Sequence, residues 1–376
     1  MSAVIEAPAP VDAPTRPHIV VPRSVSGARS AGLPMAVTAA AVLAAAIAVP
    51  SLAGNYWTFI ATYFLIYAMI GLSLILVTGY VGQVTLMAGT VVGIGAFTSA
   101  AVETHFGWPF WASIVAAGVA TLPFSLAVGF PALRLRGLYL AIATLAFGRL
   151  IEELLFRGWD WFSGGFAGVA VKRPTLGISF ESDTRYFWLV LFFFCLVVAF
   201  MFSFSRSRIG RAMRATRENE PAAQAMGVNI VKYKMMAFFL SGVVAGIAGS
   251  LQVHLVKSAT LDTYGFYLSF IVFIMVVIGG ARSIWGGILG GWFLIIQTEL
   301  LRGVEWLTRY TDIAFGIGVL WVVLSNPEGL AGFFRDRWLW VREKPKWRAL
   351  VAAGFATANV AVMWLMIHYG TQKGGA

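Results

Sequence analysis

The sequence predicts an all-α fold, namely a polytopic integral membrane bundle with about 10–11 transmembrane helices. Of the 376 residues, 59% are hydrophobic and 12% are charged, and the mean hydropathy is +0.78. Soluble globular domains carry about 25% charged residues, so this chain lacks the charge needed to cover a water-facing surface. Its formal charge of +11 comes from basic residues between apolar segments, which argues against a nucleic-acid groove.

Long apolar segments recur along the chain at the length of a membrane span. A helix needs about 20 apolar residues to cross about 30 Å of hydrocarbon. Glycine dilutes the hydrophobicity of the segment 84–102, and the neighbouring segments 264–280 and 284–300 leave open a partly re-entrant arrangement. Eleven segments qualify as spans: 35–53, 57–77, 84–102, 112–130, 138–156, 186–204, 236–254, 264–280, 284–300, 308–324 and 349–369.

The basic residues of the connecting loops predict the orientation. Loops rich in Lys and Arg remain on the cytoplasmic side because basic residues resist translocation. With a cytoplasmic N-terminus, all basic loops fall on that side: the loop with Arg134 and Arg136, the long loop 205–234, the loop with Arg282, and the segment 335–348. The N-terminus is therefore predicted to be cytoplasmic.

Composition divides the chain into three parts. Residues 1–32 are rich in Pro and Ala and contain no apolar core, which predicts a disordered cytoplasmic tail. Residues 33–332 form the predicted transmembrane domain. Residues 333–376 comprise a basic cytoplasmic segment and an appended C-terminal helix, for which a membrane-surface position is the alternative to a span.

The loop 205–234 is the long polar interruption in the second half of the chain. Seven basic residues against two acidic ones give it a net charge of +5. The pattern predicts a short helix over 209–216 and a second helix capped by Asn219 or Glu220. The residues of interest are Arg211, Arg214, Arg217, Pro221, Ala222, Ala223, Ala225 and the C-terminal cap candidate Gly227. Two helical pieces indicate a docking surface, and a solvated basic loop is the alternative.

Two glycine clusters lie far apart in the sequence, one in each half. Closely spaced glycines allow helices to approach each other, and this packing role is one interpretation. Transporters also place broken helices in corresponding positions of two halves, around a midplane pathway, which is the second interpretation. The first cluster contains Gly79, Gly82, Gly89, Gly93 and Gly95, with Gln83 and Thr85, and the second contains Gly279, Gly280, Gly286 and Gly287.

Ionisable residues are scarce inside the predicted spans. Carriers driven by protons or ions usually need a buried acid or base, so the energy for transport is expected from elsewhere. Arg149, Glu152 and Glu153 are interpreted as interfacial residues at a helix end, and His254 and Lys257 as membrane anchors. The chain contains no phosphate-binding loop, no metal-ligand spacing and no paired catalytic carboxylates deep in a span, so an intramembrane enzyme is rejected.

Three strings carry a family resemblance: TGYVGQVTLMAGTVVGIGAF (78–97), GLYLAIATLAFG (137–148) and GRAMRATRENEPAAQAMGVNIVKYK (210–234). Together they resemble the permease subunits of branched-chain amino acid ABC importers, over roughly 56–332. The resemblance implies an ABC-importer-type helical fold and a loop that the ATPase subunit grips through a Glu, two Ala and a following Gly. The matching residues are Glu220, Ala222, Ala223 and Gly227, with Pro221 interrupting the Glu-Ala-Ala run.

The resemblance also implies a set of partners and a place in the cell. These are a second permease subunit that is a related but different chain, two ATP-binding cassette ATPases and an extracytoplasmic solute-binding protein, assembled in a bacterial inner membrane. No cofactor is expected on this chain, because ATP and Mg would bind the partner ATPase. The solute would be a branched-chain amino acid or another amino acid, amide or urea. A stand-alone secondary carrier or channel is the alternative.

Overall fold

The computed structural model describes residues 54–135, 137–165, 168–174 and 180–302, together with 313, 316, 319–320 and 329–332. The predicted tail 1–32, the predicted span 35–53 and the segment 333–376 with its appended helix lie outside the described residues. Most of the predicted span 308–324 lies outside them as well. Arg136 is also outside.

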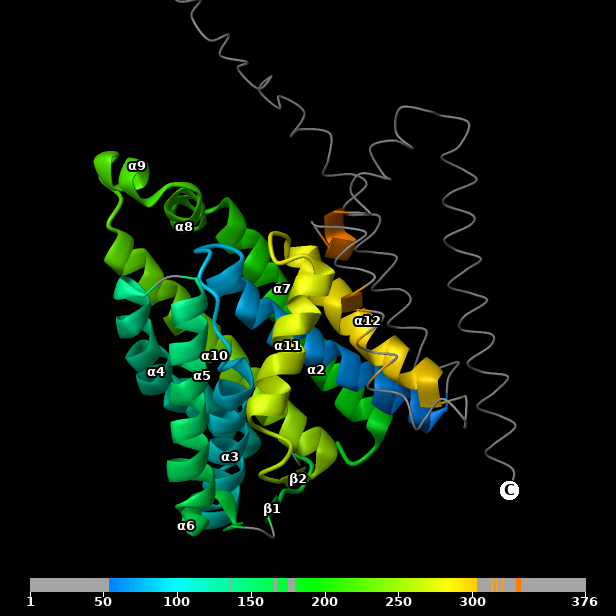
Figure 1. Ribbon diagram of the computed structural model, residues 1–376. Coiled ribbons are helices and arrows are strands. Elements are labelled where there is room, and N and C mark those ends of the chain that lie inside the picture. Colours follow the sequence, from blue (N-terminus) through cyan, green and yellow to red (C-terminus); the bar gives the residue numbers. More distant parts are fainter. Residues whose placement is uncertain are drawn as a thin grey trace, which may run out of the picture. The chain divides into compact units, whose positions relative to one another are not determined.

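The described part of the chain is helical, apart from one short strand pair (Figure 1). The two strands, β1 and β2, are antiparallel, with Val169 opposite Ala259. The elements in chain order are α2 (Asn55–Thr78), α3 (Ala88–Phe106), α4 (Phe110–Arg134), α5 (Leu138–Ile151) with the π-helical turn η1 (Glu152–Arg157), α6 (Asp160–Ser163), β1 (Val169–Ala170), α7 (Asp183–Arg206), α8 (Arg208–Glu218), α9 (Glu220–Ala225), α10 (Ile230–Val256), β2 (Ser258–Ala259), α11 (Phe266–Gly279) and α12 (Ile284–Arg302).

The long helices run between two ends of the bundle. Helices α8 and α9 lie at one end, which we name the α8 end, and β1, β2 and α6 lie at the opposite end, named the β1 end (Figure 1). The chain enters α2 from the β1 end and leaves it towards the α8 end, and α10 runs the other way. Positions along the long helices are therefore described by the end to which they are nearer, the α8 end or the β1 end.

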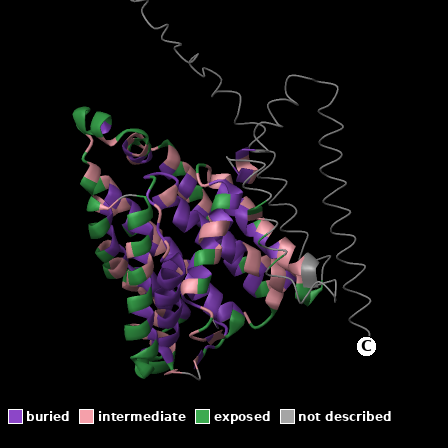
Figure 2. Ribbon diagram, viewed as in Figure 1, coloured by how far each residue is buried: buried purple, intermediate pink, exposed green. Residues whose placement is uncertain are grey.

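Helices α2 and α10 form the core of the bundle. The stretch of α2 from Leu65 to Val77 is buried throughout, and α10 packs against α2, α3 and α4. By contrast, α4, α5 and α7 expose apolar side chains such as Val119, Ile142 and Phe192 (Figure 2). A helix that is apolar on all faces is stable only when both faces avoid water, so the exposed apolar surfaces fit contact with lipid.

Four helices in the described residues are long and apolar enough to cross a membrane, namely α2, α4, α7 and α10. They confirm the predicted spans 57–77, 112–130, 186–204 and 236–254 and extend each by a few residues. Helix α5 with η1 covers the predicted span 138–156. The helical bundle of the prediction is therefore confirmed in the described part, and these described residues provide up to five spans if the bent pair α11–α12 counts as one.

The structure differs from the prediction at three of the predicted spans. The prediction of a helix over 84–102 is wrong at its start, because residues 79–87 form a non-helical link between α2 and α3 and the helix begins at Ala88. Gly82 adopts a φ of 74° in this link, a conformation that does not continue a helix. The predicted spans 264–280 and 284–300 correspond to α11 and α12, which bend by 117° at the break between Gly279 and Ile284, and this geometry fits either one broken span or a re-entrant loop.

Candidate functional site

The polar connection between α7 and α10 is an ordered helical module. Ser207 caps α8 by accepting a hydrogen bond from the backbone N–H of Gly210 at 3.1 Å, and Asn219 caps α9 through the N–H of Ala222 at 3.0 Å. Gly227 follows α9 with a φ of 82°, the left-handed conformation of a helix C-terminus. The structure confirms the two predicted helices. It also confirms the cap at Asn219 and the position of Gly227 at a helix end.

The connection is shorter than the predicted loop 205–234. Helix α7 continues to Arg206 and α10 begins at Ile230, so Lys232 and Lys234 belong to the first turns of α10. The helical backbone hydrogen bonds of α7 and α10 thus continue past the apolar stretches of both helices into the polar end of the bundle. We name residues 207–229, with α8 and α9, the α8–α9 module.

Two arginines of α8 turn back onto the end of α7. Arg211 Nη1 donates to the carbonyl oxygen of Arg206 at 2.6 Å, and Arg214 Nη2 donates to that of Ser205 at 2.7 Å. The last carbonyls of a helix carry partial negative charge and lack helical partners. Arg211 and Arg214 therefore tie α8 to α7, which is a structural use of the basic residues in addition to any docking role.

Arg217 connects the α8–α9 module to the membrane bundle. Its Nη1 donates to the carbonyl oxygen of Gly79 at 2.5 Å, across a sequence separation of 138 residues. Its side-chain stem covers Gly82, where an added Cβ would lie 2.8 Å from Arg217 Cγ. Burial, and then the positive charge of Arg282, lower the pKa of Arg217, and Glu218 offsets part of this. Helix α8 is thereby fastened to the link 79–87.

A buried ion pair fixes α9 to the start of α10. The Nζ of Lys234 lies 2.7 Å from Oε1 of Glu220, and the lysine side chain is 1% exposed. Glu220, which the family resemblance placed at the ATPase contact, therefore has a partner within its own chain. Ala223 is also buried and packs the short helix down.

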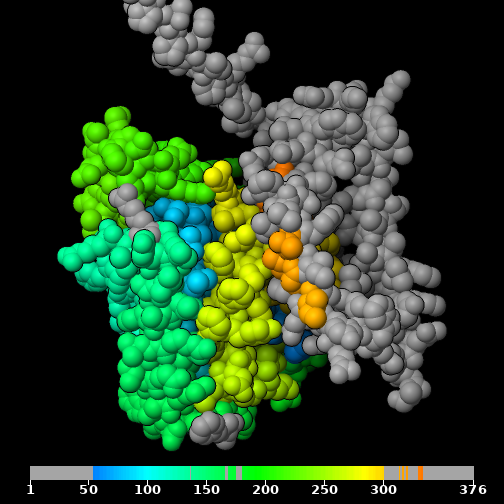
Figure 3. Space-filling model, viewed as in Figure 1, coloured from blue at the N-terminus to red at the C-terminus, as the bar shows by residue number. Residues whose placement is uncertain are grey.

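Exposed apolar residues lie at the end of α9 and at the start of α10. Met226 is 85% exposed and Val231 is 54% exposed, which are high values for large apolar side chains. Ala222 and Gly227 are exposed beside them, and nothing lies within 4 Å of the position that a Cβ of Gly227 would occupy. The α8–α9 module projects from the bundle in the space-filling view (Figure 3). We name Ala222, Met226, Gly227 and Val231 the α9 patch.

The predicted glycines of the first cluster lie at helix contacts. An added Cβ at Gly89 would clash with the backbone of Ser269 on α11, and one at Gly95 would lie 2.5 Å from Gly246 Cα on α10. At Gly93 it would lie 2.7 Å from Tyr264 Cβ. Close approach of backbones requires the absence of a side chain at these positions. The structure thus gives these three residues the packing role.

The glycines of the second cluster bring α11, α12 and α2 together. An added Cβ at Gly279 would clash with the backbone oxygen of Gly286, and one at Gly286 would clash with that of Gly280. At Gly287 it would lie 3.0 Å from the backbone nitrogen of Leu72 on α2. These contacts allow the bent pair to fold back on itself and on the core.

A small cavity lies between α2, the link 79–87, α3, α4 and α10. Its volume is about 20 Å³, enough for one water molecule. Among the predicted residues, Thr85 lines it, and Gln83 is buried nearby in the same link. The lining residues are Ser73, Leu74, Val77, Thr85, Met87, Ala88, Val91, Ser125, Phe238, Ser241 and Ala245. Sequence reasoning missed the three serines, because single serines are common in membrane helices and carry no periodic signal.

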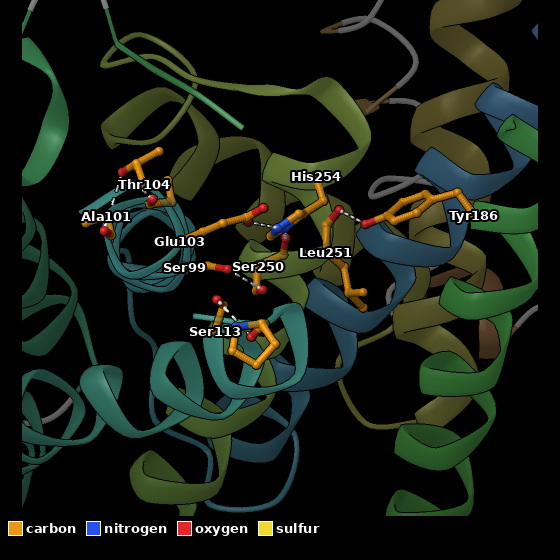
Figure 4. Close-up of polar contacts among 11 residues, drawn as sticks. Ser99, Ala101, Glu103, Thr104, Ser113, Tyr186, Ser250, Leu251 and His254 are labelled. Carbon is orange, nitrogen blue, oxygen red and sulfur yellow. Dashed lines mark hydrogen bonds and ion pairs between the residues drawn. The ribbon is translucent and has the colours of Figure 1, made fainter. Parts of the chain in front are cut away.

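A polar cluster occupies the β1 end (Figure 4). His254 on α10 is 0% exposed, and its Nε2 lies 2.7 Å from Oε2 of Glu103 on α3. Its Nδ1 lies 2.7 Å from the carbonyl oxygen of Ser250, whose hydroxyl is 2.8 Å from that of Ser99. His254, interpreted from the sequence as a membrane anchor at a helix end, is instead a buried partner of Glu103 close to the end of α10. The sequence offered no sign of the pairing, since 151 residues separate the histidine from its partner.

The remaining ionisable residues of interest pair where α5 meets η1, opposite the first turn of α3. Arg149 Nη1 lies 2.9 Å from Oε2 of Glu152, and the Thr90 hydroxyl donates to Oε1 of Glu152 at 3.3 Å. Arg149 is exposed while Glu152 is buried, so the pair bridges the surface and the core. Lys257 is exposed just after α10, in agreement with its predicted position at a helix end.

The structure combines three features of a membrane transport subunit. They are long apolar helices, a polar module attached to the link 79–87, and a polar cavity beside that link. Residues 56–323 match the family described as the branched-chain amino acid transport system / permease component. The chain belongs to this family. No solved structure shows significant similarity to it.

Several relatives span most of the chain. The high-affinity branched-chain amino acid transport system permease protein LivM of Salmonella typhimurium is 31% identical over 322 residues, which cover 79% of this chain and 75% of LivM. LivM of Escherichia coli K12 shows the same identity and coverage. The permease protein LivH of S. typhimurium is 24% identical over 300 residues, covering 71% of this chain and 91% of LivH. Two types of permease protein are thus similar to this one chain.

Proposed function

We propose that this chain is a permease subunit of an ATP-binding cassette importer, which forms the membrane pathway for branched-chain amino acids or related small polar solutes. Its LivM relatives carry the name of such a transport system. In this proposal the chain performs no chemistry of its own. ATP and Mg bind the partner ATPase, whose hydrolysis drives the change in the membrane subunit.

The observation that carries the proposal is the bond from Arg217 to the carbonyl of Gly79. It attaches a projecting helical module to a non-helical link inside the bundle. A partner that displaces α8 would therefore pull on the link 79–87 directly. A charge-assisted hydrogen bond contributes about 1.5–3 kcal/mol, which is enough to keep module and link together during such a displacement.

The α9 patch is the proposed docking surface for the ATPase. Its exposed apolar side chains suit the core of a protein interface, and the exposed residues Arg208, Arg211 and Arg214 of the adjoining helix α8 suit a polar rim. This assignment would put the α8 end of the bundle in the cytoplasm of a bacterial inner membrane. A cytoplasmic N-terminus then requires that the predicted span 35–53 crosses the membrane once before α2. The β1 end would then face the extracytoplasmic solute-binding protein.

The working unit would contain two permease chains and two ATPases. Similarity to both LivM and LivH supports a pair of related permeases, in which a LivH-like chain is the second subunit. Twofold arrangements of related subunits are the common form of closed oligomers. The binding protein would deliver the solute to the β1 end.

Substitution within the α9 patch tests the docking surface. We expect Met226→Asp to reduce co-purification of the ATPase and ATP-driven leucine uptake at least tenfold in proteoliposomes, because a charge would enter an apolar interface. Lys172→Asp is the control for co-purification of the ATPase only, since Lys172 is also exposed but lies next to β1, at the opposite end of the bundle. Retention of ATPase and uptake by Met226→Asp would remove α9 from the interface.

A second substitution tests the coupling through Arg217. Arg217→Met retains much of the side-chain stem but loses the hydrogen bond to Gly79, so we expect the ATPase to remain bound while uptake per ATP hydrolysed falls. Arg208→Met, at the exposed start of the same helix, is the control. Leucine uptake by the purified chain without any ATPase would instead favour the stand-alone carrier.

A further inference from the structure

Helices α3 and α10 share a line of contacts that leads to the β1 end (Figure 4). The facing residues recur every four positions on each helix, so they lie on one face of α3 and one face of α10. The line begins where two glycines let the backbones approach closely, and it reaches an acid and a base near the β1 end. The facing pairs are Gly95 with Gly246, Ser99 with Ser250, and Glu103 with His254.

The geometry of the imidazole determines how many protons the last pair holds. The Nδ1 of His254 lies 2.7 Å from the carbonyl oxygen of Ser250, and a carbonyl oxygen only accepts, so Nδ1 carries a hydrogen. The Nε2 lies 2.7 Å from Oε2 of Glu103. An ionised carboxylate and an unprotonated Nε2 are both acceptors, so a contact this short requires one proton between them. The pair therefore holds one proton, on either the imidazole or the carboxyl group.

The surroundings bury the imidazole but leave the carboxyl group within reach of water. His254 is 0% exposed, and the ring of Phe110 at the start of α4 packs nearly perpendicular to it, with 4.9 Å between the ring centroids. The Glu103 side chain retains 23% exposure. Protons can therefore enter and leave the pair through Glu103 while the imidazole stays buried.

The other titratable groups around the pair have partners or face water. The Tyr186 hydroxyl donates to the carbonyl oxygen of Leu251 at 2.7 Å, and the guanidinium of Arg173 pairs with Asp183. Helix α4 contributes the uncharged Phe110. Among the described residues, the groups next to the pair are Tyr186 on α7, Arg173 ahead of α7, the exposed His105 on α3 and the exposed Lys257 just after α10.

We propose that Glu103 and His254 form a proton-binding site that clamps α3 to α10 at the β1 end. With its proton, the pair joins the two helices through a charge-assisted hydrogen bond, one of the stronger bonds between side chains. When the proton passes to water, the lone pair of Nε2 faces a carboxylate oxygen, and the two acceptors repel each other. A second proton, taken up in acid, leaves a carboxyl oxygen that still accepts from Nε2–H. The clamp therefore opens only as the pH rises.

The clamp lies where it can control the β1 end. Helix α10 leads through Lys257 to β2, which pairs with β1, and α3 leads through residues 107–109 to α4. In the orientation proposed above, the β1 end faces outward, so the clamp would respond to the pH outside the cell. Only this consequence rests on the proposed function, because the clamp itself concerns the contact of two helices.

Hydrogen exchange of the backbone amides of the full chain in lipid nanodiscs tests the clamp. Each rate is divided by the intrinsic rate at the same pH, which gives a protection factor. We expect amides 251–257 to lose at least tenfold in protection between about pH 6 and about pH 9, while the central turns of α10 stay unchanged. His105→Gln is the matched control, since it removes an exposed histidine at the same end and should show the same loss.

Glu103→Gln separates the proton from the packing. A glutamine amide can donate to an unprotonated Nε2 or accept from a protonated one, so this variant should keep its protection at both pH values. His254→Gln donates to the Glu103 carboxylate at either pH and should behave in the same way, so it decides if Glu103→Gln fails to insert.

Two results would overturn the clamp. One is protection of amides 251–257 that does not change with pH in the unsubstituted chain. The other is a loss of protection at about pH 9 that persists in the glutamine variants, because another group would then be titrating. These measurements require neither ATPase nor solute, so a failure of the proposed transport function would leave them unaffected.

Discussion

The ion pair between Glu220 and Lys234 offers a direct measure of how firmly α9 is held. We expect Glu220→Ala to loosen α9, because it leaves the ammonium group of Lys234 buried at 1% exposure without its carboxylate. Removing one partner of a fully buried pair costs about 3–5 kcal/mol. The Glu220 side chain retains 17% exposure, so water screens the pair and we take about 2 kcal/mol.

Hydrogen exchange of the backbone amides is the appropriate assay, because the effect is local. A loss of about 2 kcal/mol corresponds to about 30-fold faster opening, which we expect for amides 220–231 and not for the central turns of α10. The double variant Glu220→Ala with Lys234→Met should recover most of the protection, since methionine fills the volume of the lysine stem without a charge.

Glu218→Ala is the control for the loss of an acidic side chain, since Glu218 is exposed at the end of α8. It should leave exchange at 220–231 within twofold of the unsubstituted protein. Two results would refute the reasoning: unchanged exchange in Glu220→Ala, or a double variant as labile as the single one. Either result would mean that the buried ammonium group finds another partner at no cost.

Three further outcomes follow from the contacts described above. Gly279→Ala should lower the melting temperature in detergent by several degrees because its Cβ would clash with the backbone of Gly286, whereas Gly54→Ala, with open space around it, should be neutral. Asn219→Ala removes the α9 cap and should cost about 1 kcal/mol, measured as about fivefold faster exchange of amides 220–225. Glu103→Ala leaves the buried Nε2 of His254 without its hydrogen-bond partner and should cost about 1–3 kcal/mol in resistance to thermal unfolding.

Local chemistry made the α8–α9 module predictable from the sequence. Asn219 and Gly227 act on backbone groups within three or four residues, so their roles depend little on the rest of the chain. The long apolar helices were predictable for a related reason, because length and hydrophobicity alone decide whether a segment can cross a bilayer. Family membership was also visible in short strings and is confirmed by the match over 56–323.

The rest depends on how helices rotate and pack, which the sequence alone does not reveal. The pair Glu103–His254 joins two helix ends that are 151 residues apart, and either residue alone resembles an interfacial anchor. The start of α3 was misplaced by four residues, because Val84, Leu86 and Met87 are apolar and read as part of a span, although they belong to the non-helical link 79–87.

The bundle has two helix breaks, the link 79–87 in the first half and the turn between α11 and α12 in the second. They meet beneath α8, and this contact is the mechanical basis of the coupling proposal. Gly79, at the end of α2, has no room for a Cβ because the backbone oxygen of Ala281, in the turn between α11 and α12, lies against it. Arg217 bonds to the carbonyl of the same Gly79, and its pKa is lowered by Arg282 of that turn. A displacement of α8 would therefore move both breaks together. Helices are stiffer along their axes than loops are. Helices α3 and α12 would therefore carry one motion from the α8 end into both halves of the bundle.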